Sequence, residues 1–249
     1  MVSSVYERWM NYARDNEQNK EFLKYLVFQR NGGREEFIDE DYKMLESFCN
    51  AGIIASPPAD DYNFFLEFLE ESGITKEELG YSQSAMIRFW DGFIIPSWGT
   101  GSNFLFCVNH NKERKSGLDG KYINIYPDNK KEILSDFRFY GLESTAEALS
   151  SGAMCVCEGI FDRIRLEAEG FPAMTTLGSK ISSTQIRIMN RFDRIILIGD
   201  NDRAGREAQK DIMKGVKRVS QYLIPYEKDI DDLAKKRPEV FKEFIQKIR

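Results

Sequence analysis

Three acidic residues stand where two predicted β-strands end, and their types and spacing suit metal chemistry. Glu158 directly follows the apolar run Ala153–Cys157, while Asp200 and Asp202 follow the run Arg194–Gly199. In an open parallel sheet the ligand crevice lies at the carboxyl ends of the strands, so these side chains are expected to face one pocket. Carboxylate oxygens are hard ligands that suit Mg²⁺ or Mn²⁺, and three of them together repel one another without a cation. The pattern therefore predicts a site for divalent metal and phosphate.

Each half of this pattern also has a simpler interpretation. Glu158 is then an ordinary loop acid, and residues 200–202 form a turn that caps the following helix. The combination favours the metal site, because one βαβαβ interval separates the two halves. Gly159 and Gly205 add support, since the backbone must turn sharply after each strand and the next helix must pack closely.

The elements that would position these acids alternate between strands and helices. Short apolar runs separated by stretches of helical periodicity predict a βαβαβαβ unit, with a mainly parallel sheet and right-handed crossovers. The predicted elements are the strand Ala153–Cys157, the helix Phe161–Glu169, the strand Ala173–Thr176, the helix Ser183–Asn190, the strand Arg194–Gly199, the helix Ala204–Val219 and a strand near Gln221–Ile224.

The rest of the chain surrounds this unit with other kinds of structure. Helical spacing of apolar residues predicts a mostly helical lobe over 1–80, and β-type runs between 81 and 147 predict a small antiparallel sheet. Residues 228–249 are expected to form one or two terminal helices. The expected fold class is therefore α+β combined with α/β, with domains at 1–147, 148–227 and 228–249.

Composition and charge limit the classes of protein and partner. The chain has 249 residues, 42% of them hydrophobic, which suffices for a globular core, and no apolar stretch approaches the roughly 20 residues of a membrane span. The net charge is −5, but residues 1–80 hold 17 acidic and 8 basic residues, against 23 and 27 in 81–249. The later part is thus the better candidate for contacting phosphate. We expect a cytoplasmic protein with no membrane partner.

The cysteines do not form a zinc motif. With a single histidine in the chain, Cys49, Cys107, Cys155 and Cys157 give no paired Cys or Cys/His spacing of the kind that binds zinc. Cys155 and Cys157 lie two apart in an apolar run and are expected to be core residues on one face of a strand. Free thiols fit a reducing compartment, and no zinc is expected.

Two segments that contain the acidic residues resemble the motifs of a known fold. Glu158–Asp162 (Glu-Gly-Ile-Phe-Asp) and Asp200–Arg206 (Asp-Asn-Asp-Arg-Ala-Gly-Arg) look like the glutamate and DxD motifs of the Toprim fold. That fold is shared by bacterial-type primases, type IA and II topoisomerases, recombination-mediator proteins and certain nucleases. Between the two motifs, Thr175–Ser179 resembles the Thr-Leu-Gly loop of bacterial-type primases.

Further segments resemble the catalytic core of bacterial-type DNA primases, in that family's order. They are Gly92–Pro96, Lys121–Asn124, Phe139–Leu142 and Lys228–Asp232, the last with Ile230 in place of the family's proline. The resemblance covers about residues 60–249. It implies an enzyme, a DNA-directed RNA polymerase that makes short RNA primers on single-stranded DNA during DNA replication.

The resemblance also implies roles for particular residues. Glu158, Asp200 and Asp202 would be catalytic. An acidic cluster would hold two or more Mg²⁺ or Mn²⁺ ions and the triphosphate of the incoming nucleotide, and it comprises Glu158, Asp162, Asp200, Asp202, Asp229 and Asp231. Lys121 would contact template or primer phosphate. By position alone, further basic candidates are Arg114 and Arg138 for nucleic acid and Lys180, Arg203 and Arg206 for the nucleotide.

Two departures from the family pattern qualify these expectations. The glycine-rich Gly-Phe-Gly-Gly-Arg element has no good copy, because the corresponding stretch Phe104–His110 contains no arginine. No amino-terminal zinc-binding module for reading the start site is expected either. A compact primase of this kind looks like those encoded by phages, which would place it in the host cytoplasm. Its partners would be single-stranded DNA, ribonucleoside triphosphates and a replicative helicase.

Two other functions stay open from sequence. A Toprim-type metal-dependent nuclease would use the same acids to hydrolyse phosphodiesters, and a non-catalytic helicase-associated module would bind nucleic acid without turnover. The Lys121–Asn124 and Tyr140–Leu142 segments favour the primase, because a nuclease has no evident need for them.

Overall fold

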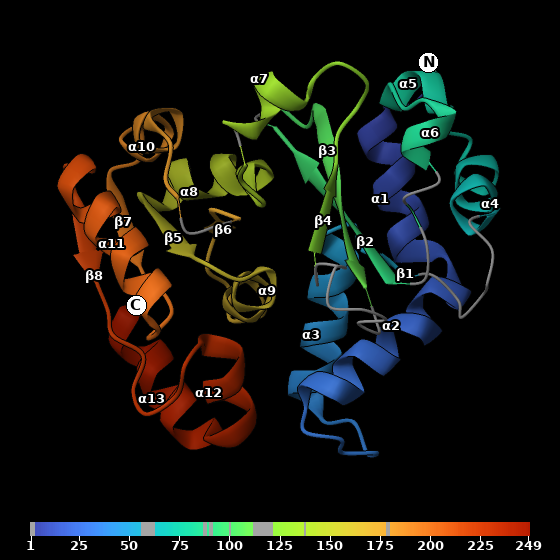
Figure 1. The fold of residues 1–249 in the computed structure, drawn as a ribbon. Helices are drawn as coiled ribbons and strands as arrows, with labels where there is room; N and C mark the ends of the chain where they lie inside the picture. Colours follow the sequence, from blue (N-terminus) through green and yellow to red (C-terminus); the bar gives the residue numbers. More distant parts are fainter. Residues whose placement is uncertain are drawn as a thin grey trace. The chain divides into compact units, whose positions relative to one another are not determined.

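Helices and two separate β-sheets make up the described part of the chain (Figure 1). The computed structural model describes residues 3–55, 63–86, 89, 92–99, 101–111, 122–136, 138–177 and 180–249. Contacts divide the chain into two units, the first formed by Met1–Val27 and Leu45–Leu134 and the second by Phe28–Met44 and Ser135–Arg249. Residues Phe28–Met44 form a helical hairpin, which consists of the end of one helix, a loop and the start of the next helix. This hairpin belongs to the second unit, although the sequence placed it in the helical lobe 1–80.

The first unit is an antiparallel sheet with helices around it. Its strands pair in the order β1-β2-β3-β4, which confirms the predicted small antiparallel sheet. The two-residue strand β1 was not predicted, because two residues show no periodicity. In chain order the elements up to the second sheet are α1 (Val5–Asp15), α2 (Glu17–Arg30), α3 (Asp39–Asn50), β1 (Ile54–Ala55), α4 (Asn63–Ser72), α5 (Lys76–Leu79), α6 (Gln83–Met86), β2 (Gly92–Trp98), β3 (Phe104–Asn111), β4 (Tyr122–Ile125) and α7 (Lys131–Ser135). The end of α2, the start of α3 and the last residue of α7 belong to the second unit.

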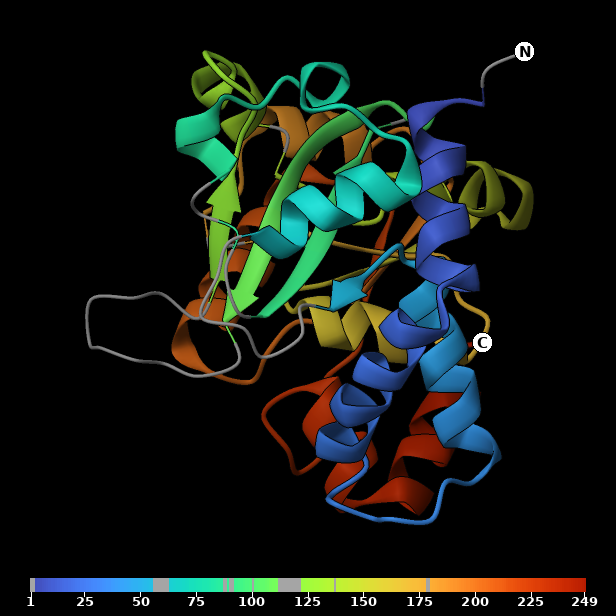
Figure 2. The same cartoon turned by 90° about the vertical axis from the view of Figure 1, so that its right-hand side faces the viewer.

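Aromatic side chains fill the core of the first unit. Trp9 of α1 meets Trp98 of β2 edge to face, with 5.8 Å between ring centroids, and meets Phe68 of α4 at 4.7 Å. Such pairs contribute about 0.5–1.5 kcal/mol each beyond the burial of their area. The indole N–H of Trp9 donates to the carbonyl of Gly52 at 2.7 Å, so its one polar group is satisfied. These contacts hold α1 and α4 against one face of the sheet, as Figure 2 shows.

The second unit is built on a fully parallel sheet. Its strands pair in the order β6-β5-β7-β8, which confirms the predicted mainly parallel sheet. Its elements after the hairpin are the 3₁₀ turn η1 (Leu142–Ser144), α8 (Thr145–Ser151), β5 (Ala153–Cys157), α9 (Ile160–Ala168), β6 (Ala173–Thr175), α10 (Ser183–Met189), β7 (Arg194–Leu197), α11 (Arg203–Gly215), β8 (Val219–Gln221), α12 (Ile230–Lys236) and α13 (Pro238–Ile248).

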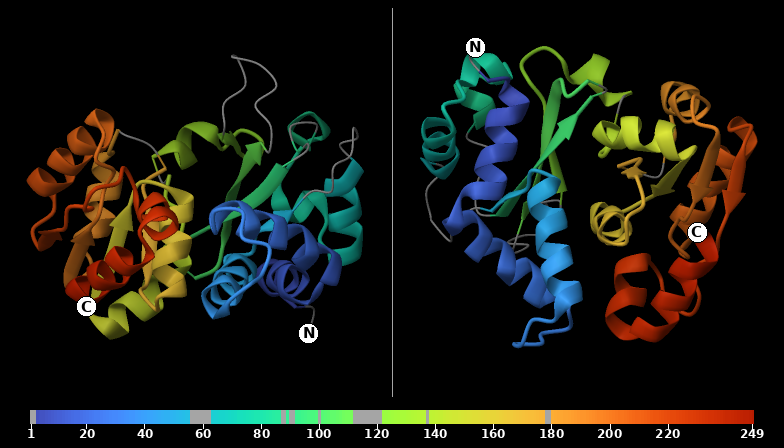
Figure 3. Two further views of the ribbon diagram at one scale, coloured as in Figure 1. Left: turned by 90° about the horizontal axis from the view of Figure 1, so that it is seen from below. Right: turned by 180° about the vertical axis from the view of Figure 1, so that it is seen from behind.

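Helices cover both faces of this parallel sheet, as the apolar central strands β5 and β7 require. One face packs on α9, α12 and α13 through a cluster that includes Cys155, Cys157 and Phe244. The predicted role of the two cysteines as core residues is confirmed, since they are 1% and 2% exposed. Helices α10 and α11 lie on the other side of the sheet (Figure 3). None of the described helices is long and apolar enough to cross a membrane.

The last strand and the helix before it differ in extent from the prediction. The helix ends at Gly215 rather than Val219, and β8 begins at Val219 instead of near Gln221. Strand pairing explains the shift, because Val219 is the register partner of Ile195 in β7. Gly215 suits the helix end, since a Cβ there would lie 2.8 Å from a methyl group of Ile186 in α10.

A buried arginine joins the segment before α8 to the parallel sheet. Arg163 of α9 donates to Glu143 at 2.7 Å and to Glu167 at 2.7 Å, and its guanidinium lies 4.0 Å from the centroid of the Tyr140 ring. Tyr140 also exchanges two backbone hydrogen bonds with Thr175, at 3.0 and 2.8 Å. The Tyr-Gly-Leu segment of the predicted family signature is therefore attached to β6 and α9.

Gly141 sits within this buried network, and we expect alanine there to be costly. Its φ is +106°, and an added Cβ would collide with the carbonyl oxygen of Ala173 and lie 2.7 Å from Arg163 Nε. We expect Gly141→Ala to lower the free energy of unfolding by about 2–4 kcal/mol, from backbone strain and overpacking together. Gly152→Ala is the matched control, because its φ is +78° and no atom of the described residues lies within 4 Å of its added Cβ. Urea denaturation that gave equal losses for both variants would contradict the close packing.

Candidate acidic site

Glu158 begins the loop after β5, and a threonine hydroxyl holds that loop. Thr175, the last residue of β6, donates from Oγ1 to the carbonyl of Glu158 at 2.7 Å and accepts from the amide of Leu177 at 3.1 Å. The loops that follow two neighbouring parallel strands are thus tied together by one buried side chain. Thr175 therefore positions the backbone of Glu158. From sequence it was named only as part of a motif, without this role.

Asp200 and Asp202 follow β7 and lie beside Glu158. Asp202 caps α11, since its carboxylate accepts from the amide of Gly205 at 2.9 Å. Gly205 allows the close approach, because a Cβ there would lie 2.5 Å from the Asp200 carbonyl oxygen and 2.9 Å from Glu158 Oε2. Asp202 therefore caps α11, as the simpler interpretation expected. The cap does not prevent Glu158, Asp200 and Asp202 from lying close together.

Burial and mutual repulsion make the protonated forms of two of these acids favourable. Burial, followed by the charges of Asp200 and Asp202, raises the pKa of Glu158 to about 7. Burial also raises the pKa of Asp200 to about 6, against the opposing effect of Lys228. Hydrogen bonding to the amide of Gly205 lowers the pKa of Asp202. A cation is the group that would best relieve this arrangement.

A lysine provides part of that positive charge. Lys228 Nζ lies 3.4 Å from Asp200 Oδ2 and 3.3 Å from Asp202 Oδ2. Asn201 fixes the lysine's segment, since its amide donates to the Lys228 carbonyl at 2.8 Å and its side chain donates to the carbonyl of Glu227 at 2.7 Å. From sequence, Lys228 was named only as the first residue of a motif, and no role was predicted for it. The one feature of the sequence that points to a role for Lys228 near the acids is its position directly before Asp229.

The structure brings Asp162 and Asp229 to the same cluster. Asp162 is buried, and its carboxylate accepts from the amides of Gly159 at 3.2 Å and Asp231 at 3.0 Å. Burial is the main cause that raises its pKa, and the charges of Asp229 and Asp200 add to it. Asp229 caps α12 through the amide of Asp232 at 2.7 Å, and burial raises its pKa as well.

Asp231 faces a different set of partners. Asp231 is 4% exposed, and its carboxylate is bound by two guanidinium groups, Arg30 at 2.7 Å and Arg165 at 3.1 Å. Arg30 comes from the end of α2, so the helical hairpin contributes to the surroundings of the cluster. Only the backbone amide of Asp231 reaches Asp162, and the assignment of its carboxylate as a metal ligand stays a prediction.

The predicted basic residues are spread around this region. Arg203 and Arg206 lie exposed on the first turn of α11, with Arg203 3.3 Å from Glu207 and Arg206 donating to the carbonyl of Asn201. Lys180 is exposed, and Arg138 donates to the carbonyl of Ser135 at 2.9 Å. Lys121 and Arg114, the other two predicted nucleic-acid contacts, lie outside the described residues.

Carboxylate oxygens are suitable ligands for a divalent cation, although in this structure the acids are not arranged as a metal-binding site. Among the residues that the structure describes, no three Asp, Glu, His or Cys side chains are grouped as a metal site, and Asp200 and Asp202 pair with Lys228. Glu158 Oε2, however, is buried and has no hydrogen-bond partner among the residues described. A buried acceptor without a donor, beside two more hard oxygen ligands, fits Mg²⁺ or Mn²⁺.

Comparison with known proteins defines first the class of this unit and then the fold of the whole chain. Residues 155–234 match a family model described as Toprim-like. Among solved structures, the RNA polymerase domain of Mycobacterium tuberculosis primase DnaG gives a TM-score of 0.67 at 15% identity, over 98% of this chain and 84% of that one. The chain therefore contains a Toprim-like segment and has the fold of a bacterial primase catalytic core, as its sequence predicted.

Other primases show the same likeness. The zinc-binding and RNA polymerase domains of Aquifex aeolicus primase give a TM-score of 0.66 at 20% identity, over 97% of this chain. This chain spans 59% of the length of that one. The Escherichia coli primase catalytic core gives 0.63 at 18% identity, over 98% of this chain and 80% of that one. No curated protein sequence matches. Phage origin and the lack of a zinc module stay predictions.

The raised pKa of Glu158 predicts how stability depends on pH when divalent ions are absent. A carboxyl group with a raised pKa in the folded state holds its proton more tightly there, so its contribution favours folding at low pH. For Glu158 this contribution is lost as pH rises from 4.5 through about 7. In EDTA at about pH 8, we expect Glu158→Gln to be more stable than wild type by about 1–2 kcal/mol, a value reduced for its partial exposure.

Urea denaturation at several pH values checks this expectation. The advantage of Glu158→Gln should shrink toward zero near pH 5, where the folded protein already holds the proton. Glu147→Gln, on the exposed side of α8, is the control and should show no such pH dependence. A Glu158→Gln protein that is no more stable than wild type at about pH 8 would show that the acids do not repel one another as described.

Proposed function

We propose that this chain is the catalytic core of a DNA primase, which synthesises short RNA primers on single-stranded DNA. The observation that carries the proposal is the convergence of Glu158 with Asp200 and Asp202, at the ends of β5 and β7, within the fold of primase catalytic cores. The likeness in fold covers 98% of this chain, so it includes the first unit as well as the Toprim-like segment.

The acidic residues would act through bound divalent ions. Mg²⁺ or Mn²⁺ held by Glu158, Asp200 and Asp202 would supply positive charge to the reacting phosphates and to the pyrophosphate that leaves. Thr175 and Gly205 keep the three carboxylates together, and Asp162 and Asp229 lie in the same acidic cluster. We include Asp162, Asp229 and Asp231 in the proposed metal-binding cluster.

Basic residues would hold the two substrates. Arg203, Arg206 and Lys180 are proposed to contact the triphosphate of the ribonucleotide, since the first two lie on the first turn of the helix that Asp202 caps. Lys121, Arg114 and Arg138 are proposed contacts of the nucleic acid. Two related structures support a DNA template: a DnaG primase catalytic domain bound to single-stranded DNA, and the Mycobacterium tuberculosis domain with a double-stranded oligomer that has an overhang.

The proposal extends to organisation and partners. We assign residues 1–147 to the primase-type amino-terminal subdomain, 148–227 to the Toprim domain and 228–249 to a terminal helical segment. A replicative helicase is the proposed protein partner, and the cytoplasm is the proposed compartment. A nuclease that uses the same acids is the rival function, and one assay separates the two.

Primer synthesis from unlabelled single-stranded DNA, Mn²⁺ and labelled ribonucleotides tests the proposal. We expect short RNA products from wild type and a loss of at least about 100-fold in Asp200→Asn/Asp202→Asn, because the charges that would hold the ions are removed. Asp193→Asn is the matched control, since this exposed acid precedes β7 and pairs only with Arg218 at 3.3 Å among described residues. Circular dichroism checks that each variant is folded.

Two outcomes would overturn the proposal. One is full activity in the Asp200→Asn/Asp202→Asn variant. The other is cleavage of the DNA without any RNA product, which would assign the same site to a nuclease.

The contact between Lys228 and the acids gives a separate prediction for cation binding. Lys228→Met removes a charge that competes with the ions, so we expect Mn²⁺ to bind about threefold to tenfold more tightly in a calorimetric titration. Lys236→Met is the matched control, because the two lysine side chains are 55% and 54% exposed and Lys236 pairs with Glu227 and Asp232 instead. Unchanged or weaker Mn²⁺ binding in Lys228→Met would contradict competition at this site.

A further inference from the structure

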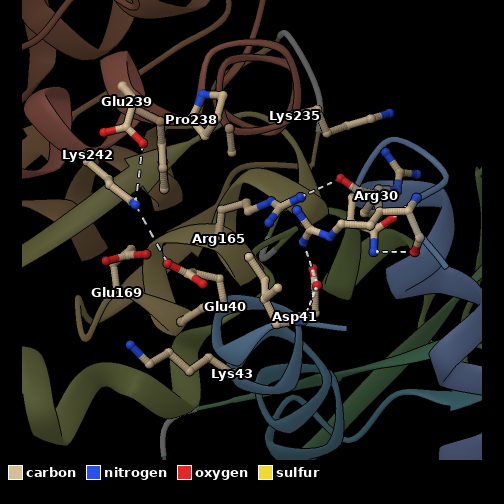
Figure 4. A pocket seen from close by; sticks show the side chains of 16 residues that line it. Arg30, Glu40, Asp41, Lys43, Arg165, Glu169, Lys235, Pro238, Glu239 and Lys242 are labelled. Atoms are coloured by element: carbon tan, nitrogen blue, oxygen red, sulfur yellow. Dashed lines mark hydrogen bonds and ion pairs between the residues drawn. The ribbon is translucent and has the colours of Figure 1, made fainter. Parts of the chain in front are cut away.

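A pocket separate from the acidic loops lies within the second unit. It has a volume of about 450 Å³ and is bounded by the hairpin over Phe28–Met44, by α9 and by the pair α12 and α13 (Figure 4). All of these segments belong to the same unit. The volume falls in the range of small-molecule sites, which is about 300–1,000 Å³. The site proposed for primer synthesis includes Asp231, which lies behind one wall of this pocket, but it uses none of the residues that line the pocket.

Two arginines form one wall of the pocket, and a buried acid holds them in place. Arg30 and Arg165 both bind Asp231, and Arg165 also donates to the carbonyl of Arg30 at 2.7 Å. Arg30 is further fixed by the ring of Phe161, which lies 3.7 Å from its guanidinium carbon. Its Nε is buried and has no acceptor among the described residues, so the wall carries an unmet hydrogen-bond donor. Held guanidinium groups bind phosphate with little loss of entropy.

Lysines add positive charge that the protein does not neutralise. Lys43 and Lys235 line the pocket, and neither forms an ion pair with any described residue. The acids of the lining are largely engaged: Asp41 binds Arg34 at 2.5 Å, and Lys242 lies 3.6–3.8 Å from Glu40 and Glu239. Six cations and four acids line the pocket, and Asp231 lies behind the wall, which leaves a net charge of +1.

Apolar groups complete the lining. Ile38, Ala168, Ala234 and Phe241 contribute carbon surface between the charged side chains. Ile38 is 42% exposed and offers apolar surface to the pocket. A ligand that matches this lining has an anionic end and a flat or compact apolar part.

We propose that this pocket binds a nucleotide, free or at the 5′ end of a nucleic-acid strand. Its phosphates would contact Lys43, Lys235 and the wall of Arg30 and Arg165, and its base or sugar would cover Ile38 and Phe241. The pocket is thus a second phosphate-binding site of the chain. Its occupant is recognised without a divalent ion, because the pocket supplies the positive charge itself.

Calorimetry with ADP in EDTA tests this inference. Without divalent ions the carboxylate cluster repels phosphate, which weakens binding at the site proposed for primer synthesis. We expect ADP to bind wild type and adenosine to bind at least tenfold more weakly. Lys43→Ala/Lys235→Ala should weaken ADP at least tenfold, since two charge-assisted contacts are lost. Lys210→Ala/Lys217→Ala, which removes two exposed lysines outside the pocket, should stay within twofold.

The result also identifies the source of the phosphate. A 5′-phosphorylated dinucleotide that binds more tightly than ADP assigns the pocket to the end of a strand, whereas weaker binding assigns it to a free nucleotide. The inference is overturned if ADP does not bind wild type at about 0.1 M salt, where short-range charge contacts persist. It is also overturned if Lys43→Ala/Lys235→Ala binds ADP as tightly as wild type does. Neither result bears on primer synthesis, which is measured with divalent ions present.

Discussion

Repulsion among partly buried carboxylates is the constraint on which the second unit depends. Glu158, Asp200 and Asp202 are brought together by the parallel pairing of β5 and β7, and their charges raise the free energy of the folded chain when no cation is present. Two local features hold the three carboxylates together despite this repulsion. They are the Thr175 hydroxyl and the absence of a side chain at Gly205. Lys228 offsets part of the repulsion. A site that is strained without its cation is poised to bind one.

Buried arginines provide the framework around this constraint. Arg163 ties Glu143 and Glu167 beneath the Tyr140 ring, so the segment before α8 is attached to the sheet that carries the acids. In the same way Arg30 and Arg165 fix Asp231, whose amide holds Asp162. Charged groups this deeply buried contribute to stability only while all partners remain, since removal of one partner costs about 3–5 kcal/mol. Both networks therefore make the position of the acids sensitive to distant substitutions.

The sequence predicted the parallel unit well because its signals are local. Apolar runs set the strands, and the placement of Glu158 and Asp200 directly after them indicated which residues would meet. Three features could not be predicted in this way. The strand Ile54–Ala55 is too short for periodicity, the pairing of Lys228 with Asp200 and Asp202 depends on a loop path, and the pocket joins Arg30 to Arg165 across 135 positions of sequence. Long-range charge contacts of this kind leave no periodic trace in a single sequence.

The central claim is that Glu158, Asp200 and Asp202 form one cation site. The most direct measurement is an anomalous-difference map from crystals of the protein soaked in Mn²⁺. We expect a peak about 2.0–2.6 Å from carboxylate oxygens of these three residues, with Lys228 Nζ moved away from Asp200 and Asp202. A map without a peak there, in which Lys228 still bridges the two aspartates at saturating Mn²⁺, would contradict this claim.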